Sequence, residues 1–138
     1  MKNPRIAGLT IVRARPDDAG EIYGLIVLGT KRGKVLKRPL NEIRRQIGIF
    51  FIARIGGRPV GCVALDVYNR KLAEVRSLVV RAPWERRSIA TRLIQACLRE
   101  AGRRGVYEVL VITDRHRLFR RFGFREELHG QKALFHRP

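Results

Sequence analysis

The chain is short of acidic residues, of cysteines and of long apolar segments. Only 12 Asp and Glu stand against 30 Lys and Arg in 138 residues. No uninterrupted apolar run is long enough to span a bilayer. The first residues, Met1 to Pro4, are not followed by the apolar core of a signal peptide. We therefore expect no membrane association and no secretion, and we expect a cytoplasmic location.

The two cysteines exclude a disulfide scaffold and give no sign of a metal centre. Cys62 lies within a strand pattern, and Cys97 lies in the apolar stripe of a helix. Neither has a partner at the spacing of a metal site. We expect both to be small buried residues in a reducing compartment, and we expect no bound metal.

What the chain has in excess is positive charge. A formal net charge of +18 attracts polyanions such as nucleic acid or a phosphorylated cofactor. The basic residues are mostly arginine and are spread along the whole chain. No zinc-finger spacing, aromatic RNA-binding pattern or basic heptad accompanies them. A compositional bias displayed on solvated surfaces also explains the charge, so nonspecific polyanion binding stays open.

The chain is organised around the stretch from Leu72 to Ala101, which predicts a strand, a short basic loop and an amphipathic helix. The strand Leu72–Val80 is rich in Val and Leu, and Pro83 ends it because proline cannot donate to a ladder. Ser88 is a residue type that favours the N-cap of a helix. The apolar residues that follow recur at helical spacing and form one stripe: Ile89, Leu93, Ile94, Cys97 and Ala101.

The loop between this strand and this helix is a candidate phosphate site. Free backbone N–H groups collect at a helix N-terminus, and Arg86 and Arg87 add positive charge there. An ordinary strand–helix connection with solvated arginines fits the same residues equally well. Geometry and charge alone leave both interpretations open.

The remaining elements complete a mixed α/β fold. Helices precede and follow a largely antiparallel run of strands, with one parallel step around the central helix. This order predicts a three-layer α/β sandwich, a mixed, mostly antiparallel sheet flanked by helices, in a single domain over residues 1–138. Besides the central strand and helix, we expect strands at 9–13, 50–55, 60–68, 106–113, 124–128 and 133–136, and helices at 16–29, 39–47 and 117–121.

The central stretch resembles the acetyl-CoA-binding core of the GNAT acetyltransferase superfamily. The family pattern Q/R-x-x-G-x-G/A aligns with residues 85–90, where Ala90 matches and Glu85 and Ser88 depart. A carboxylate at Glu85 is unfavourable near phosphates unless it turns outward or pairs with an arginine. Across nearly the whole chain, four segments are similar to N-acetylglutamate synthase-like amino-acid acetyltransferase domains: IVRARPDDAGEIYGLI, RPVGCVALDVY, LAEVRSLVV and LFRRFGFRE.

The resemblance implies a GNAT-type fold and an acetyl-CoA-dependent N-acetyltransferase, with acetyl-CoA as co-substrate and no metal. In this family the central strand separates from its neighbour, and a backbone N–H of that strand polarises the thioester carbonyl. Phe119 occupies a position where many members have a tyrosine, and synthase-like relatives also carry phenylalanine there. The implied cofactor-binding residues are Leu78, Val79, Val80, Arg86, Arg87, Ser88, Ile89, Ala90, Thr91 and Phe119.

Glu74 occupies the place of the strand glutamate that acts as general base in several GNAT enzymes. A carboxylate in a partly buried cleft can take a proton from an ammonium group near neutral pH. A salt bridge with Arg76 is the structural alternative for this residue. The leaving thiolate needs a proton, and Phe119 cannot donate one. Tyr23, Tyr107 and solvent remain as candidate donors.

The implied acceptor is a primary amine, in particular the α-amine of a small amino acid such as glutamate. Arginine suits a carboxylate because its planar fork binds both oxygens. The residues carried over for substrate binding are Arg38, Arg76, Ser77 and Lys132. Two alternatives remain: a catalytically weak acyl-CoA-binding protein and an arginine-rich nucleic-acid-associated protein. A homodimer also stays open.

Overall fold

The fold is a mixed five-stranded sheet between two layers of helices. The structure is a computed structural model that describes residues 6–85 and 88–138. The sheet order is β1-β2-β3-β4-β5. Its neighbours pair antiparallel, except β4 and β5, which are parallel. The strands are β1 (Leu9–Arg13), β2 (Phe50–Ile55), β3 (Arg58–Val67), β4 (Leu72–Val80) and β5 (Glu108–Val111).

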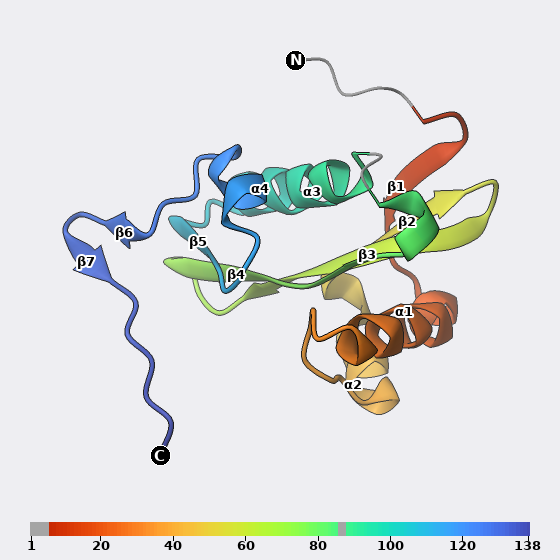
Figure 1. The fold of residues 1–138 in the computed structure, drawn as a ribbon, viewed down its shortest axis with the longest axis horizontal. Helices are drawn as coiled ribbons and strands as arrows, with labels where there is room; N and C mark the ends of the chain where they lie inside the picture. Colours follow the sequence, from red (N-terminus) through yellow and green to blue (C-terminus); the bar gives the residue numbers. More distant parts are fainter. Residues whose placement is uncertain (1–5, 86–87) are drawn as a thin grey trace.

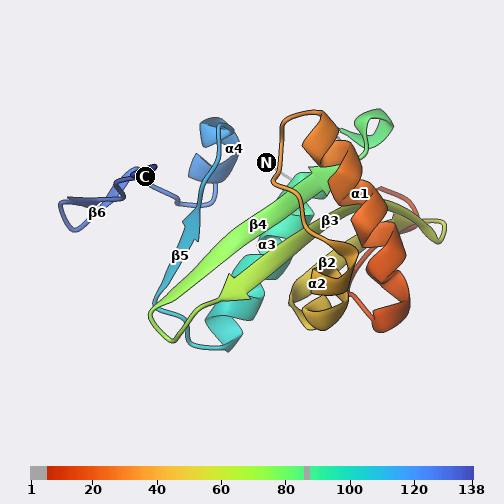
Figure 2. The same ribbon diagram turned by 90° about the horizontal axis from the view of Figure 1, so that it is seen from below.

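Helices cover both faces of this sheet. Figures 1 and 2 show α3 and α4 on one side and α1 and α2 on the other. The sequence therefore predicted the layers and the mixed sheet correctly, and the fold class is confirmed. The helices are α1 (Ala19–Lys31), α2 (Leu40–Arg45), α3 (Ile89–Arg103) and α4 (His116–Arg120), and short 3-10 turns span Pro16–Asp18, Ile47–Ile49 and Ala82–Trp84.

Two apolar cores hold the layers together, one on each face of the sheet. The expected stripe of α3 is buried in the first core, and Leu93 is 0% exposed. The second core packs α1 and α2 against the other face around Phe50 and Ile52. β4 serves both cores, with Val80 in the first and its neighbour Val79 in the second. Burial of both faces explains why the central strands are so rich in apolar residues.

A buried carboxylate joins the first strand to the central helix. Glu100 on α3 accepts hydrogen bonds from Arg13 on β1 and from Arg103 in its own helix. Burial alone would raise the pKa of Glu100, but the hydrogen bonds from Arg103 and Arg13 outweigh it, so the pKa is lowered. The ionised Glu100 therefore stabilises the fold at pH values above the ordinary carboxyl pKa. This stabilisation is lost as the pH falls through the lowered pKa of Glu100.

Helix α1 is longer than predicted because Gly29 has a packing role. We expected Gly29 to end the helix, but it is buried, and a Cβ atom there would lie 2.7 Å from Val79 Cγ2. The helix continues to Lys31 and ends in a Schellman motif, in which Gly33 has a positive φ and Lys34 N–H bonds the Gly29 carbonyl at 2.8 Å. The close approach to β4, not chain termination, therefore requires a glycine at position 29.

The C-terminal strand predictions were wrong in position. No strand forms at 133–136; instead β6 (Glu127–Leu128) pairs with β7 (Gln131–Lys132). Both loop residues, His129 and Gly130, have positive φ, as a two-residue hairpin loop favours. Figure 1 shows this hairpin away from the main sheet. A strand of two residues is too short to be found from alternation.

The described helices include none with the length and apolar character needed to cross a bilayer. Likewise, in residues 6–85 and 88–138, no cluster of three or more His, Cys, Asp or Glu side chains could hold a metal ion.

Gly61 on β3 gives a stability test of the close packing beneath the site. A Cβ atom at Gly61 would lie 2.9 Å from the backbone oxygen of Val79, so the strands must shift to accept it. We expect Gly61→Ala to lower the free energy of unfolding by about 1–3 kcal/mol in urea titrations. Gly24→Ala is the control, because Gly24 lies in α1 with open space around it. The control should leave stability unchanged or raise it by up to about 1 kcal/mol, and equal effects of the two variants would contradict this account.

Candidate functional site

A crevice opens where β4 and β5 separate. The two strands pair only from Leu72 with Glu108 to Val75 with Val111. β5 then ends, whereas β4 continues to Val80. Among the described strands, none pairs with residues 76–80 on that side. Backbone groups along this edge of β4 therefore face the crevice instead of another strand.

A β-bulge marks the point of separation. Ser77 and Leu78 of β4 stand opposite the single residue Val63 of β3, because the register shifts between Cys62 and Ala64. Ser77 has a φ of +57°, which is unusual for a residue with a side chain. A bulge bends its strand and redirects the residues that follow, so it helps β4 leave β5.

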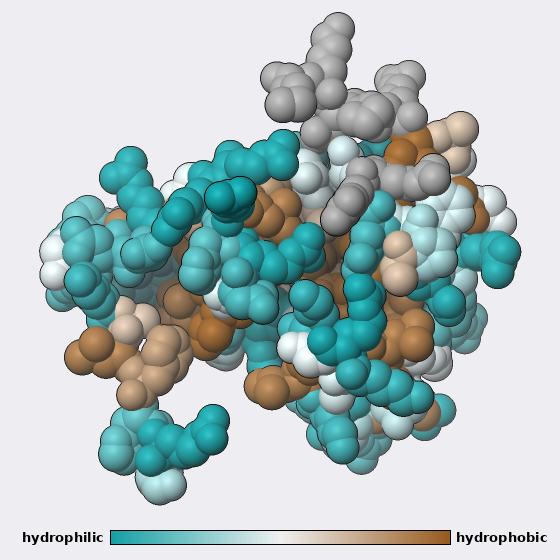
Figure 3. All heavy atoms as spheres, in the orientation of Figure 1, coloured by the Kyte–Doolittle hydropathy of each residue, from teal (hydrophilic) through white to brown (hydrophobic). Residues whose placement is uncertain are grey.

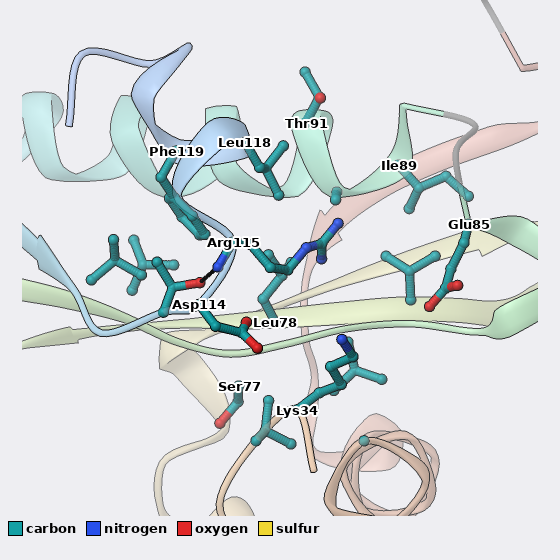
Figure 4. Close-up of a pocket in the computed structure, with 18 of the residues that line it drawn as sticks. Lys34, Ser77, Leu78, Glu85, Ile89, Thr91, Asp114, Arg115, Leu118 and Phe119 are labelled. Carbon is teal, nitrogen blue, oxygen red and sulfur yellow. Dashed lines mark hydrogen bonds between the residues drawn. The ribbon is translucent and has the colours of Figure 1, made fainter. Parts of the chain in front are cut away.

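The crevice has a volume of about 810 Å³, which is enough for an extended cofactor. Its walls come from the free edge of β4, the first turn of α3, the segment after β5, helix α4 and the loop after α1 (Figure 4). In the space-filling view, hydrophilic residues cover most of the surface and hydrophobic patches show between them (Figure 3). The lining combines apolar and basic side chains, which suits a ligand with an apolar arm and charged groups.

Most of the predicted cofactor-binding residues line this crevice. Arg86 and Arg87 lie outside the described residues. Phe119 is buried at the crevice wall and packs edge-to-face with Phe124 at 5.4 Å between ring centroids. The residues from that prediction that line the crevice are Leu78, Val79, Val80, Ser88, Ile89, Ala90, Thr91 and Phe119.

The two departures from the family pattern have local structural solutions. Glu85 is paired with Arg32 at the end of α1, so its charge is balanced by an arginine, as the sequence required. Ser88 stands at the N-cap of α3, but its φ is +64° and its side chain makes no cap hydrogen bond. The predicted start of the helix is therefore confirmed, but Ser88 caps it without a side-chain hydrogen bond and adopts the left-handed backbone that a glycine adopts most easily.

Arg38 is a buried charge and not an open substrate ligand in this structure. It is 3% exposed. Its Nε donates to Ser77 Oγ at 2.9 Å, Nη2 to Asp66 Oδ2 at 2.9 Å and Nη1 to Gln46 Oε1 at 3.1 Å. The guanidinium also lies 5.3 Å from the centroid of the Phe50 ring. Arg38 and Ser77, both predicted to bind substrate, bond to each other and connect the segment before α2 to the bulge, and Ser77 also lines the crevice.

Arg76 extends this network to the crevice. Its Nη1 donates to Asp66 Oδ2 at 3.1 Å, and the residue lines the crevice. Burial opposes the charge of Arg76, but Asp66 outweighs it and raises the pKa of Arg76. Arg76 is therefore a charged, half-buried group beside the free edge of β4.

Glu74 lies two residues before Arg76, so both side chains extend from the same face of β4. Its Oε1 accepts a hydrogen bond from Tyr68 Oη at 2.5 Å. Burial, followed by the bond to Glu74, raises the pKa of Tyr68, so the phenol keeps its proton. Within the described residues Arg76 pairs with Asp66 and not with Glu74, so the alternative salt bridge is not observed. Glu74 lies beside the crevice and is not among its lining residues.

The structure does not bring the other candidates to this place. Lys132 is exposed in β7 of the C-terminal hairpin, which Figure 1 shows away from the main sheet. Tyr107 is 69% exposed and Tyr23 is 39% exposed, and neither lines the crevice.

Both cysteines are inert in this arrangement. Cys62 lies under the bulge, and its thiol donates to the Ser77 carbonyl at 3.5 Å. Burial raises the pKa of Cys62 and of Cys97 to about 12. Neutral buried thiols are poor nucleophiles, so acyl transfer through a cysteine is not supported.

Sequence reasoning missed several residues of the site. Asp66 is an acid within an apolar strand run, and that pattern signals a buried ion pair that could have been found. The basic residues that line the crevice carried no local signal, because arginines occur along the whole chain. The crevice cations not singled out from the sequence are Arg32, Lys34, Arg115, Arg117 and Arg121.

The chain matches known acetyltransferases in sequence. Residues 31–124 match the acetyltransferase (GNAT) family. An uncharacterized N-acetyltransferase of Chlorobaculum tepidum is 36% identical over 118 residues, which cover 85% of this chain and 76% of that protein. An amino-acid acetyltransferase of Mycobacterium tuberculosis is 29% identical over 129 residues, covering 91% of this chain and 73% of that protein.

Solved structures agree with the sequence matches. A Mycobacterium tuberculosis protein in complex with CoA and NLQ superposes with a TM-score of 0.81 and 26% identity, covering 86% of this chain and 73% of that one. N-acetylglutamate synthase of Neisseria gonorrhoeae, complexed with coenzyme A and N-acetyl-glutamate, superposes with a TM-score of 0.78 and 22% identity. That match covers 86% of this chain and 28% of the synthase, and it shows the fold alone.

The fold, the crevice and these matches establish that the chain belongs to the GNAT family of acetyltransferases. It is an N-acetyltransferase that uses acetyl-CoA, as the resemblance predicted.

The buried network around Arg38 predicts a large stability effect. Arg38→Ala leaves Asp66 and Ser77 Oγ buried without their main partner, so we expect the free energy of unfolding to fall by about 3–5 kcal/mol. Arg44→Ala is the control, because Arg44 is an exposed arginine on α2, and it should change stability by less than about 0.5 kcal/mol. Urea unfolding measures both, and a similar small change in both variants would refute the structural role of Arg38.

Proposed function

We propose that this acetyltransferase transfers the acetyl group to the α-amine of a small amino acid that carries a carboxylate, such as glutamate. The observation that carries the proposal is the charged pair Arg76–Asp66 at the free edge of β4, with Glu74 on the same face. The amino-acid acetyltransferase among the sequence relatives supports this acceptor class.

The crevice fits the acetyl donor in shape and chemistry. An extended pantetheine arm can lie along the unpaired edge of β4 like an added strand. The diphosphate then meets the first turn of α3, where Ser88 to Thr91 line the crevice and free N–H groups favour an anion. Arg86 and Arg87 are proposed to contribute charge there. A backbone N–H between Leu78 and Val80 would polarise the thioester carbonyl.

Glu74 is the proposed base for the acceptor amine. The amine must lose a proton before it attacks the thioester carbon, and the coenzyme thiolate leaves as the new amide bond forms. Tyr68 holds the Glu74 carboxylate by a hydrogen bond and so fixes its direction. The thiolate takes its proton from solvent or from a group not yet assigned.

Arg76 is the proposed ligand for the acceptor carboxylate. Asp66 uses Nη1 of Arg76, and the other guanidinium N–H groups can form a charge-assisted bond with a carboxylate. Arg38 and Ser77 contribute by holding Asp66 and the bulge in place. Lys132 could join only if the C-terminal hairpin approaches the crevice, so its role stays a prediction.

The broader expectations from the sequence remain predictions. These are a single domain over residues 1–138, a cytoplasmic location, a homodimer and nonspecific polyanion binding. The weak acyl-CoA-binding alternative draws on Glu85 and Ser88, which depart from the family pattern in the loop before α3.

A thiol-release assay with a panel of acceptors tests the proposal. Amino acids with a second carboxylate should release coenzyme A faster than neutral amines of similar size. Arg76→Gln should raise KM for the acidic amino acid at least about tenfold and leave KM for a neutral amine nearly unchanged. Tight CoA binding without thiol release from any acceptor would instead support the acyl-CoA-binding alternative.

Replacement of Glu74 tests the base. We expect Glu74→Gln to lower kcat about 100-fold at neutral pH with little change in acetyl-CoA affinity. The deficit should narrow as the pH rises, because more of the acceptor amine is then already neutral. Glu127→Gln, an exposed carboxyl in the hairpin, is the control, and unchanged turnover in Glu74→Gln would remove this residue from the mechanism.

A further inference from the structure

The crevice repels cations, yet an amine acceptor reaches it as one. The pKa of an aliphatic amino group lies above neutral pH, so the acceptor arrives as an ammonium ion. Arg32 and Arg76 in the crevice have carboxylate partners. No ion pair engages Lys34, Arg115 or Arg117 among the described residues. Because like charges repel, an ammonium group can bind here only beside a carboxylate that is free to face it.

Asp114 is the carboxylate that meets this requirement. The described lining of the crevice contains two acidic residues, Glu85 and Asp114. Glu85 is paired with Arg32, whereas Asp114 forms no ion pair within residues 6–85 and 88–138. Figure 4 shows the Asp114 carboxylate pointing into the crevice toward β4. Its negative charge is therefore available to a ligand.

The parallel register of β4 and β5 places Asp114 at the level of the free edge of β4. Val75 is the last β4 residue that pairs with β5, and its partner is Val111. Leu78 and Asp114 each come three residues later, and both line the crevice. Parallel strands advance in the same direction, so the two residues lie on opposite walls just beyond the opening. An amine held by Asp114 would face the part of β4 where the thioester carbonyl is proposed to lie.

A local turn fixes the direction of Asp114. Thr113 Oγ1 accepts a hydrogen bond from the backbone N–H of Arg115 at 2.9 Å, which folds the chain tightly around Asp114. Helix α4 begins directly afterwards at His116, and its Phe119 is buried in the first core. The segment that presents the carboxylate is thus held by β5 on one side and by α4 on the other.

Glu74 has a different position. It pairs with Leu110 in the closed part of the β4–β5 ladder, and it is not among the residues that line the crevice. Its carboxylate already accepts a hydrogen bond from Tyr68 Oη. Glu74 therefore stands before the opening, and Asp114 stands within it.

We propose that Asp114 binds the ammonium group of the acceptor and makes the crevice select amines over carboxylates that lack one. This inference rests on the proposed function and deepens it: Arg76 binds the acceptor carboxylate, Glu74 keeps the proposed proton transfer, and Asp114 holds the nitrogen. The amide product has no positive charge on that nitrogen, so it loses this contact. Asp114 thus favours the substrate over the product.

Isothermal titration of the CoA-loaded full chain with L-glutamate and with glutarate tests the role of Asp114. Glutarate has the same two carboxylates and no amine. The wild type should bind glutamate at least about tenfold more tightly, because a charge-assisted hydrogen bond depends on the ammonium group. In Asp114→Asn this preference should disappear or reverse, since glutarate has the larger net negative charge. The affinity for N-acetyl-L-glutamate, whose nitrogen is neutral, should stay within about twofold of the wild-type value.

Two variants control for charge and for the other carboxylate. Asp17→Asn removes the same charge from an exposed residue before α1 that does not line the crevice, and it should keep the preference for glutamate. Glu74→Gln should keep it as well. Two outcomes overturn the role of Asp114: equal wild-type affinities for glutamate and glutarate, or a preference that is lost in Glu74→Gln and kept in Asp114→Asn.

Thiol-release kinetics separates a failure of this inference from a failure of the proposed function. Asp114→Asn should raise KM about tenfold both for glutamate and for n-butylamine, which has no carboxylate, whereas Arg76→Gln should affect glutamate alone. Normal use of glutamate with an unchanged KM in Asp114→Asn overturns the role of Asp114 alone. A wild type that acetylates n-butylamine and not glutamate overturns the acidic acceptor, and KM for n-butylamine then decides the role of Asp114. No binding of glutamate and no thiol release from either amine overturns both.

Discussion

The hydrogen bond from Arg38 Nε to Ser77 Oγ joins the two parts of the molecule on which the site depends. Ser77 lies at the bulge where β4 leaves β5, and Arg38 comes from the segment before α2. Asp66 Oδ2 accepts hydrogen bonds from both Arg38 and, at the crevice, Arg76. Because this network is largely buried, removing one member leaves another without its partner. The edge of β4 is thus held in shape before a ligand arrives, as preorganised donors require.

The shortage of acidic residues shapes the rest of the structure. Asp66 serves two arginines, and Glu100 serves Arg13 and Arg103. In contrast, Arg54 is shared by two carboxylates at the surface of α1. The few buried acids are therefore used where they connect separate elements. Most of the arginines that the structure describes take part in no ion pair, which explains how one chain can have a stable core and a strongly positive crevice.

The fold was largely predictable, and the site only in part. The pattern of β4 gave its bounds, and the apolar stripe of α3 gave the start of the helix within a residue, because both are set by local periodicity. The predicted end of α1 at Gly29 was wrong. This glycine is required by its close contact with Val79 of β4, which the local sequence does not reveal. Ser88 was placed correctly, but its left-handed backbone reflects the geometry of the loop. Arg38 and Ser77 were named as ligands of substrate, and only the structure shows that they bond to each other.

The sequence by itself determined the elements and the layers, because periodic burial needs no knowledge of distant residues. It also identified the family through the residues around the start of α3. Tertiary structure decided which charges meet: Arg38 with Asp66, Glu85 with Arg32, and Glu74 with Tyr68. It also decided which arginines face the crevice. In a chain with so many arginines, partner choice depends on three-dimensional proximity and on desolvation, and neither is encoded in local spacing.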